Sequence, residues 1–130
     1  MSEGYQRLLS FRVGSRLFGV DENKVATVAN WRQPTPLPHA PPAVMGIVSL
    51  QGRMLTVLDM RRLTSGDSTD NTPPQYVIAL RGDEQLALAV DSVEGGIELT
   101  DNNDSQVDVV NVSTLFSLAI QGRERRRRQF

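Results

Sequence analysis

Two apolar segments flank the dipeptide Gln51-Gly52, and this arrangement constrains the fold more than any other feature of the chain. Residues 44–50 read Val-Met-Gly-Ile-Val-Ser-Leu, and residues 53–59 read Arg-Met-Leu-Thr-Val-Leu-Asp. A glycine at the second turn position adopts positive φ without a steric penalty, so the sequence predicts a β-hairpin here. Asp59 ends its second strand and, like Asp91 later in the chain, is expected to accept hydrogen bonds from loop backbone groups.

A second predicted hairpin precedes this one. Residues 9–13 alternate between apolar and polar side chains, which is the period of a half-buried strand. Gly14-Ser15 then turns the chain, and residues 17–20 read as the return strand. Asp21 follows in the position of a helix N-cap, but residues 25–28 fit either a short helical turn or another extended segment.

A third predicted hairpin lies in the second half of the chain. Residues 76–80 and 86–90 form its strands, on either side of a turn. Alanines at alternate positions of the second strand indicate a face that another element covers closely. We expect residues 91–96 to end this hairpin, residues 107–112 to form a last short strand, and Ser113 to cap a final helical turn.

Polar and proline-rich segments connect these hairpins. Five prolines within residues 30–42 predict an extended crossover, because proline fixes φ and lacks the backbone donor. Residues 64–74 and 101–104 read as polar loops, and the first is expected to be mobile. Three hairpins without a long amphipathic helix predict a mainly β fold, and two small barrels that share a core would remove exposed sheet edges.

The composition excludes several classes of chemistry. No cysteine is present, so a disulfide framework, a thiolate metal site and a cysteine nucleophile are ruled out. The only histidine, His39, lies in the proline-rich crossover, where we expect a surface residue and neither a catalytic base nor a zinc ligand. No apolar run approaches the roughly 18 residues of a membrane span, and the first residues do not resemble a signal peptide, so we expect a cytoplasmic protein. The sequence thus predicts no enzymatic activity and no cofactor or metal, while the only tryptophan, Trp31, fits either the end of the core or a partner-binding surface.

Charge is distributed unevenly along the chain. Residues 122–130 hold five arginines and one glutamate, whereas residues 1–121 hold nine basic and 14 acidic side chains. A nucleic-acid reader gathers positive charge on one face of its fold, so no nucleic-acid partner is expected. We predict one domain over residues 1–121 and a disordered, solvated tail over residues 122–130. The alternative is a small β-barrel whose tail binds RNA, anionic lipid or another acidic partner.

The central hairpin resembles the signature of the CheW-like family of chemotaxis adaptors. In that family, a hairpin of the pattern Gly-apolar-apolar-Asn-Leu-Arg-Gly runs into a strand that ends in Asp-Leu-Arg. Residues 46–52 and 58–61 follow this pattern here. The resemblance extends over residues 8–100, with further matches in the family's order at residues 11–20, 25–28, 37–42 and 90–93.

This resemblance implies both a fold and a function. The family fold is two small SH3-like five-stranded β-barrels around a shared core, and its members are not enzymes. They couple a cytoplasmic, CheA-like histidine kinase to chemoreceptors, the methyl-accepting chemotaxis proteins, so the membrane is reached only through the receptors. Receptor tips bind in the groove between the barrels, and the kinase regulatory domain binds at barrel ends. By matching position, the resemblance implies partner-binding residues at Val25, Thr27, Val28, Gly46, Gln51, Gly52, Arg53 and Tyr76.

The chain departs from the family pattern in several places. Gln51 stands where the family has arginine, which removes a permanent charge and a bidentate donor. Ser49 replaces the family's asparagine, and Thr27 lies where a glutamate is expected. After Thr100 the family has a further exposed hairpin that is missing here, so the second barrel is either incomplete or closed by a partner. A divergent paralogue that binds only one of the two partners and modulates the array is therefore the alternative to a full adaptor.

Overall fold

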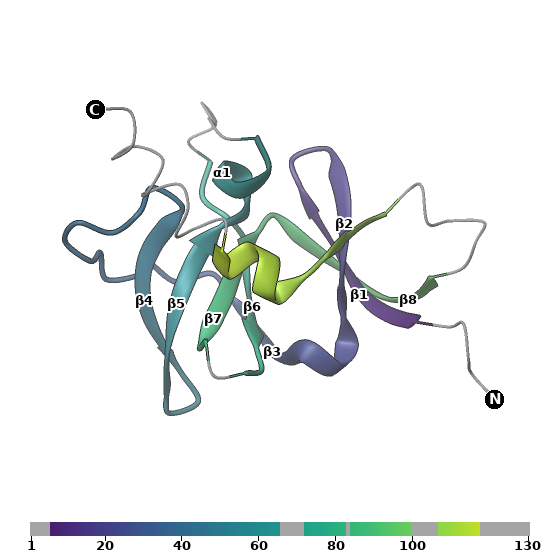
Figure 1. Cartoon of the computed structure of the whole chain (residues 1–130), viewed down its shortest axis with the longest axis horizontal. Coiled ribbons are helices and arrows are strands. Elements are labelled where there is room, and N and C mark those ends of the chain that lie inside the picture. Colours follow the sequence, from purple (N-terminus) through teal and green to yellow (C-terminus); the bar gives the residue numbers. More distant parts are fainter. Residues whose placement is uncertain (1–5, 66–71, 83, 100–106, 118–130) are drawn as a thin grey trace.

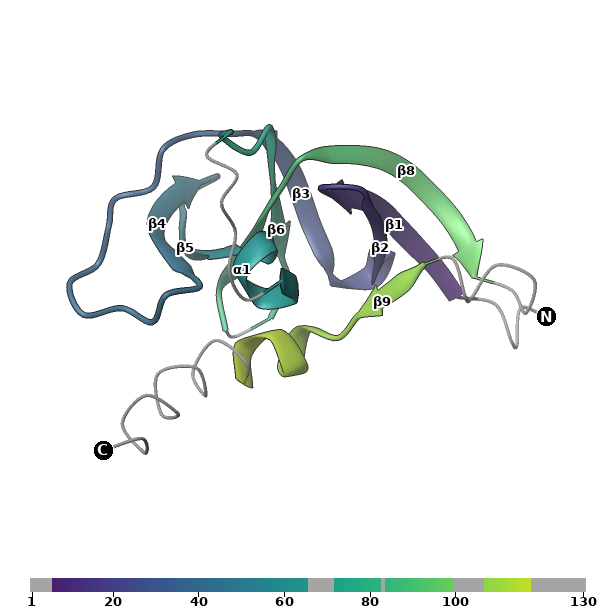
Figure 2. The same ribbon diagram turned by 90° about the horizontal axis from the view of Figure 1, so that it is seen from above.

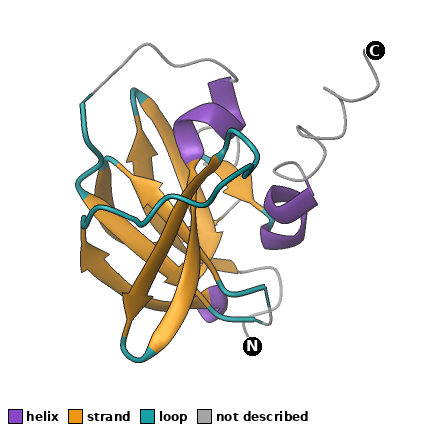
Figure 3. Cartoon of the chain, turned by 90° about the vertical axis from the view of Figure 1, so that its left-hand side faces the viewer, coloured by secondary structure: helices purple, strands orange, loops and turns teal. Residues whose placement is uncertain are grey.

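Strands make up most of the structure, a computed structural model that describes residues 6–65, 72–82, 84–99 and 107–117. The strands of this part of the chain are β1 (Gln6–Val13), β2 (Arg16–Asp21), β3 (Val25–Asn30), β4 (Val44–Leu50), β5 (Arg53–Asp59), β6 (Tyr76–Leu80), β7 (Leu86–Val90), β8 (Ser92–Leu99) and β9 (Asp108–Val110). The helical segments are the 3-10 turn η1 (Glu22–Lys24), the helix α1 (Met60–Ser65) and a helical turn over residues 112–117. The predicted mainly β fold is confirmed (Figure 3).

The strands form two sheets that lie side by side (Figures 1 and 2). One has four strands in the order β8-β1-β2-β9, and the other has five in the order β3-β6-β7-β5-β4. The five-stranded sheet comes from one continuous segment, whereas the four-stranded sheet combines strands that precede and follow it. Within the described ranges, the smaller sheet has four strands, one fewer than the family resemblance implies.

The three predicted hairpins are confirmed, because β1–β2, β4–β5 and β6–β7 each pair in antiparallel register. At the turn of the central hairpin, Gln51 and Gly52 have φ of 51° and 79°. Positive φ at both turn positions is the type I′ geometry, whose twist matches that of the flanking strands. Residues 25–28, for which a helical turn was the alternative, are extended because β3 pairs with β6.

The third hairpin ends at Val90, in agreement with the prediction, but the segment that follows it is a new strand, because β8 runs from Ser92 through Gly95 and Gly96 to Leu99. β8 pairs with β1, and the pairing register shifts between Ser10 and Phe11. At this bulge the buried Ser10 hydroxyl donates to the Gly95 carbonyl over 2.8 Å. The glycines therefore accommodate a bulge within a strand, and the strand exists because of a partner far away in the sequence.

β7 lies between two hydrophobic cores, and every one of its residues is buried. Its large side chains, Leu86, Leu88 and Val90, face the larger core, which both sheets share. Its alanines at positions 87 and 89 face a smaller core that is built from the five-stranded sheet. The small residues thus mark a closely covered face, as predicted, and the shared core implied by the family resemblance is confirmed.

Side-chain caps begin the short helical segments. The Asp21 carboxylate accepts from the Asn23 backbone N–H over 2.9 Å, so the predicted cap is confirmed, although it begins only a 3-10 turn. The final helical turn is capped by Asn111, whose side chain accepts from the Thr114 N–H over 3.1 Å, and not by Ser113 as predicted. The last strand ends at Val110 and is shorter than predicted, so the asparagine reaches the cap position first.

The proline-rich crossover between β3 and β4 is extended, as predicted. Thr35 and Ile47 exchange two backbone hydrogen bonds of 2.9 Å, which tie the crossover to β4. Trp31, at the start of the crossover, is half-buried against the smaller core, which supports the core alternative for this side chain. His39 is exposed, as expected, and has φ of 61°.

Three expectations fall outside the described residues. They concern residues 66–71 of the polar loop, the loop at 101–104, and the arginine-rich tail at 122–130.

Candidate partner-binding site

The eight residues implied by the family resemblance all lie on the five-stranded sheet or on its β4–β5 turn. They fall into two groups, because β3 and β4 are opposite edges of that sheet. The β3 group consists of Val25, Thr27, Val28 and, on the neighbouring strand β6, Tyr76. The hairpin group consists of Gly46, Gln51, Gly52 and Arg53. The structure therefore supplies two candidate surfaces rather than one patch.

β3 is an edge strand without a charged side chain. It reads Val-Ala-Thr-Val-Ala-Asn, and β6 is its only strand partner in the part of the chain that the structure describes. Val28 is 38% exposed, Thr27 is half-buried, and Val25 and Tyr76 are half-buried against the larger core. Natural edge strands usually carry charges or prolines that discourage pairing with other chains. β3 lacks these protective residues, which makes it a candidate edge for pairing with another protein.

The hairpin group combines an exposed turn with a buried glycine. Gln51 and Gly52 are exposed at the turn, and Arg53 is half-buried beside it. Gly46 is buried, and a Cβ at this position would lie 2.2 Å from the Thr35 carbonyl oxygen. Gly46 therefore lets the crossover pass close to β4, and its influence on a partner would act through the shape of the hairpin rather than by contact.

Sequence reasoning missed two side chains beside this turn. Met54 is 60% exposed and pairs with Ser49 across the hairpin. Arg32, from the crossover, donates from Nη1 to the Ser49 carbonyl over 3.0 Å. The expected strand geometry offered a signal for Met54, because successive side chains of a strand point to opposite faces and its neighbour Leu55 is buried. No local sequence pattern indicated that Arg32 lies beside the turn, because its position depends on the hydrogen bond to Ser49, which is distant in the sequence.

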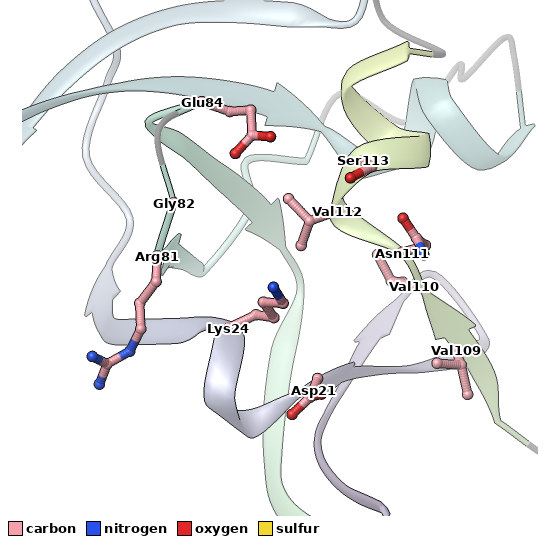
Figure 4. Close-up of a pocket in the computed structure, with 10 residues that line it drawn as sticks. All are labelled: Asp21, Lys24, Arg81, Gly82, Glu84, Val109, Val110, Asn111, Val112 and Ser113. Atoms are coloured by element: carbon pink, nitrogen blue, oxygen red, sulfur yellow. The ribbon is translucent and has the colours of Figure 1, made fainter.

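A groove of about 270 Å³ lies between the two sheets (Figure 4). One wall comes from η1 and from the chain that runs from β9 into the final helical turn, and the other comes from the β6–β7 turn. Lys24, Glu84 and Val112 point toward this groove, whereas Arg81 points away and donates to the Val25 carbonyl over 3.1 Å. The groove ends where β3 begins, so it adjoins the β3 group.

A second, more apolar groove of about 310 Å³ lies beside the proline-rich crossover. Its lining includes the exposed residues Leu37 and Phe116 together with Val44 and Leu58. Sequence reasoning missed this surface because its lining residues come from segments far apart in the chain.

The carboxylates at the strand ends make internal contacts, as predicted. Asp59 Oδ1 accepts from the Arg61 backbone N–H over 3.0 Å. Asp91 Oδ2 accepts from the Gly14 N–H over 2.6 Å, and Asp91 Oδ1 lies 2.5 Å from Arg61 Nη2. The Asp-x-Arg end of the hairpin signature therefore joins parts of this molecule to one another.

Comparison with known proteins agrees with this arrangement of sheets and core. A family model described as the CheW-like domain matches residues 7–125, which include both sheets. The chain belongs to the CheW-like family of chemotaxis adaptors. The family that the central hairpin indicated is thereby confirmed.

Several relatives of this CheW-like chain are known. The chemotaxis protein CheW of Rhizobium meliloti (strain 1021) is 28% identical over 104 residues, which cover 79% of this chain and 67% of that protein. The chemotaxis protein CheW of Thermotoga maritima is 25% identical over 115 residues, which cover 88% and 74%. Protein FrzA of Myxococcus xanthus is 31% identical over 91 residues, which cover 69% and 57%. The chain thus spans about two thirds of the length of the relatives it matches.

A solved structure supports the CheW-like fold. The crystal structure of the scaffolding protein TtCheW from Thermoanaerobacter tengcongensis superposes with a TM-score of 0.73 at 19% identity, covering 85% of this chain and 92% of that one. The helices were also compared with the requirements for a membrane span. In the described ranges, none of them has the length and apolar character that crossing a bilayer requires.

Proposed function

We propose that this chain is a cytoplasmic, non-enzymatic scaffold of bacterial chemosensory signalling, which holds a chemoreceptor tip and the regulatory domain of a CheA-like histidine kinase together. The observation that carries the proposal is the match of nearly the whole chain to the CheW-like domain. A protein that binds two partners at once raises the effective concentration of each near the other, so no bond chemistry is needed.

The two candidate surfaces suit two separate partners. β3 presents an uncharged edge and the exposed Val28, a chemistry that fits the apolar side of a receptor helix. The β4–β5 turn lies at the opposite edge of the sheet and presents Gln51, Arg53 and Met54, a more polar set that fits the kinase domain. Because the surfaces lie at different edges, one partner need not displace the other.

Val28→Asp is expected to weaken binding of a receptor cytoplasmic fragment about tenfold, which corresponds to about 1.4 kcal/mol, because a charge is placed on an apolar contact. Isothermal titration with the purified fragment measures this change. Leu37→Asp is the matched control, because Leu37 is also an exposed aliphatic residue but lies on the crossover. Equal affinities of both variants for the receptor would contradict the assignment of β3.

Gln51→Arg is expected to strengthen binding of the kinase regulatory domain about threefold to tenfold, because an arginine can hold a carboxylate with two hydrogen bonds. Gln85→Arg is the control, since Gln85 is also exposed with positive φ but lies on the β6–β7 turn. A gain that is the same for both variants would reflect net charge alone and would count against a specific contact at position 51.

The same titrations separate the full adaptor from the divergent paralogue. Two positions where the family carries charge are neutral in this chain, Thr27 and Gln51, which favours weakened contacts. Binding of both partners in one complex would support the adaptor. Binding of only one would favour the paralogue, and binding of neither by the folded protein would remove both.

A further inference from the structure

We infer that the ion pair between Arg61 and Asp91 is a clamp that fixes the angle between the two sheets and thereby sets the width of the inter-sheet groove. The groove is the one lined by η1, the β6–β7 turn and the chain after β9. Arg61 is thus a positioning residue for the receptor-binding surface, and this last step rests on the proposed function.

The clamp joins segments from both sheets. Arg61 is the second residue of α1, which directly follows β5 of the five-stranded sheet, and Gly14 lies in the turn between β1 and β2 of the four-stranded sheet. Asp91 connects them at the junction of β7 and β8: Oδ1 lies 2.5 Å from Arg61 Nη2, and Oδ2 accepts from the Gly14 N–H over 2.6 Å. The Asp91 N–H also donates to the Arg12 carbonyl over 2.9 Å. One carboxylate therefore bridges the two sheets.

Arg61 is held on a second side as well. Its Nη1 donates to the Thr72 carbonyl over 2.6 Å, and its backbone N–H donates to Asp59 Oδ1. The side chains of Arg61 and Asp91 are only 14% and 26% exposed, which makes this the least exposed ion pair among the described residues. A charge pair shielded from water is stronger than one in solvent, and a guanidinium with two fixed acceptors has a defined direction.

The clamp and the groove lie at opposite ends of the contact between the sheets. In Figure 1, α1 and the β1–β2 turn are at the top, whereas η1 and the β6–β7 turn are at the bottom. The larger core lies between these ends, and its apolar contacts are strong but not directional. A directional contact at one end of a packed interface therefore controls the separation at the other end.

A distance measurement across the groove tests the clamp without any partner. The chain has no cysteine, so spin labels attach only at introduced positions. Glu84→Cys and Val109→Cys place labels on opposite walls, both at exposed sites (Figure 4). In this labelled background, Arg61→Met is expected to lengthen and broaden the distance distribution from pulsed electron resonance. Arg62→Met, an exposed arginine of the same helix, is expected to leave it unchanged.

Two milder variants keep the proposal testable if Arg61→Met does not fold. Arg61→Lys keeps the charge but loses the two-sided fork, and Asp91→Asn keeps an acceptor for the Gly14 N–H but loses the ion pair. Intermediate broadening in these variants would support the clamp. An unchanged distribution in folded Arg61→Met, or unfolding of all three variants, would overturn it, because the contact would then serve only to hold the fold together. Receptor affinity is measured separately: a wider groove with unchanged affinity would leave the clamp in place and contradict the receptor assignment.

Discussion

Gly46→Ala is expected to lower the free energy of unfolding by at least about 3 kcal/mol, or to prevent folding. The new Cβ would lie 2.2 Å from the carbonyl oxygen and 2.7 Å from the carbonyl carbon of Thr35. These are backbone atoms of a crossover that two hydrogen bonds tie to Ile47, so they have little freedom to move. Position 46 also has φ of 144°, which side-chain-bearing residues rarely adopt. Urea denaturation followed by the fluorescence of Trp31, which packs on the smaller core, measures the loss.

Gly52→Ala is the control for this substitution. Gly52 also has positive φ, but a Cβ there would meet no atom within 4 Å, so a loss of only about 1 kcal/mol is expected. If the two variants were equally stable, the crossover could move aside, and its close approach to position 46 would not be the reason that this position requires glycine. If the Gly46→Ala variant is unfolded, as expected, its failure to bind a partner would result from loss of the fold and would not show that Gly46 contacts the partner.

Phe11→Ala is expected to cost about 3–5 kcal/mol of unfolding free energy. Phe11 is 0% exposed and stacks on Phe18 with ring centroids 5.7 Å apart. Both rings belong to the larger core, where side chains of the two sheets meet. Truncation leaves a cavity between the sheets, so denaturation measured by far-ultraviolet circular dichroism should occur at a lower urea concentration.

Leu37→Ala is the matched control, because it also truncates a large apolar side chain but at an exposed position. A change within about 0.5 kcal/mol is expected there. A shared core also predicts that circular dichroism and tryptophan fluorescence give one transition for Phe11→Ala. If the four-stranded sheet unfolded first, in a separate step, the two sheets would not depend on one core.

Local signals were sufficient for the hairpins. The Gln51-Gly52 turn and the alternation of residues 9–13 identified strands whose partners are close in sequence, and all three hairpins pair as predicted. The alanines of β7 indicated its closely covered face, because only small side chains fit where other residues pack tightly against a strand. Local patterns succeed here because the turn, the register and the partner all lie within one short segment.

Local sequence patterns did not predict the elements whose partners lie far away in the chain. β8 contains two glycines that read as a loop, and only its pairing with β1 makes it a strand. α1 was not predicted because residues 60–65 are too few for a clear helical period, although Asp59 offered a capping carboxylate. At the candidate site, the resemblance supplied Gly46, but its burial under the crossover follows from a contact between distant residues. Surface positions such as Arg32 depend on tertiary contacts for the same reason.

The nested order of the two sheets has a consequence for synthesis of the chain. β1 and β2 leave the ribosome first, but their sheet is completed only when β8 and β9 have been made, after the entire five-stranded sheet. At about 5–20 residues per second, the first hairpin waits for several seconds with Phe11 and Phe18 uncovered. The inner segment, by contrast, has all its strand partners within residues 25–90 and can assemble while the outer pair is still incomplete. Chaperone demand during translation should therefore centre on the β1–β2 hairpin, and it should end only when β8 has paired with β1 and β9 with β2.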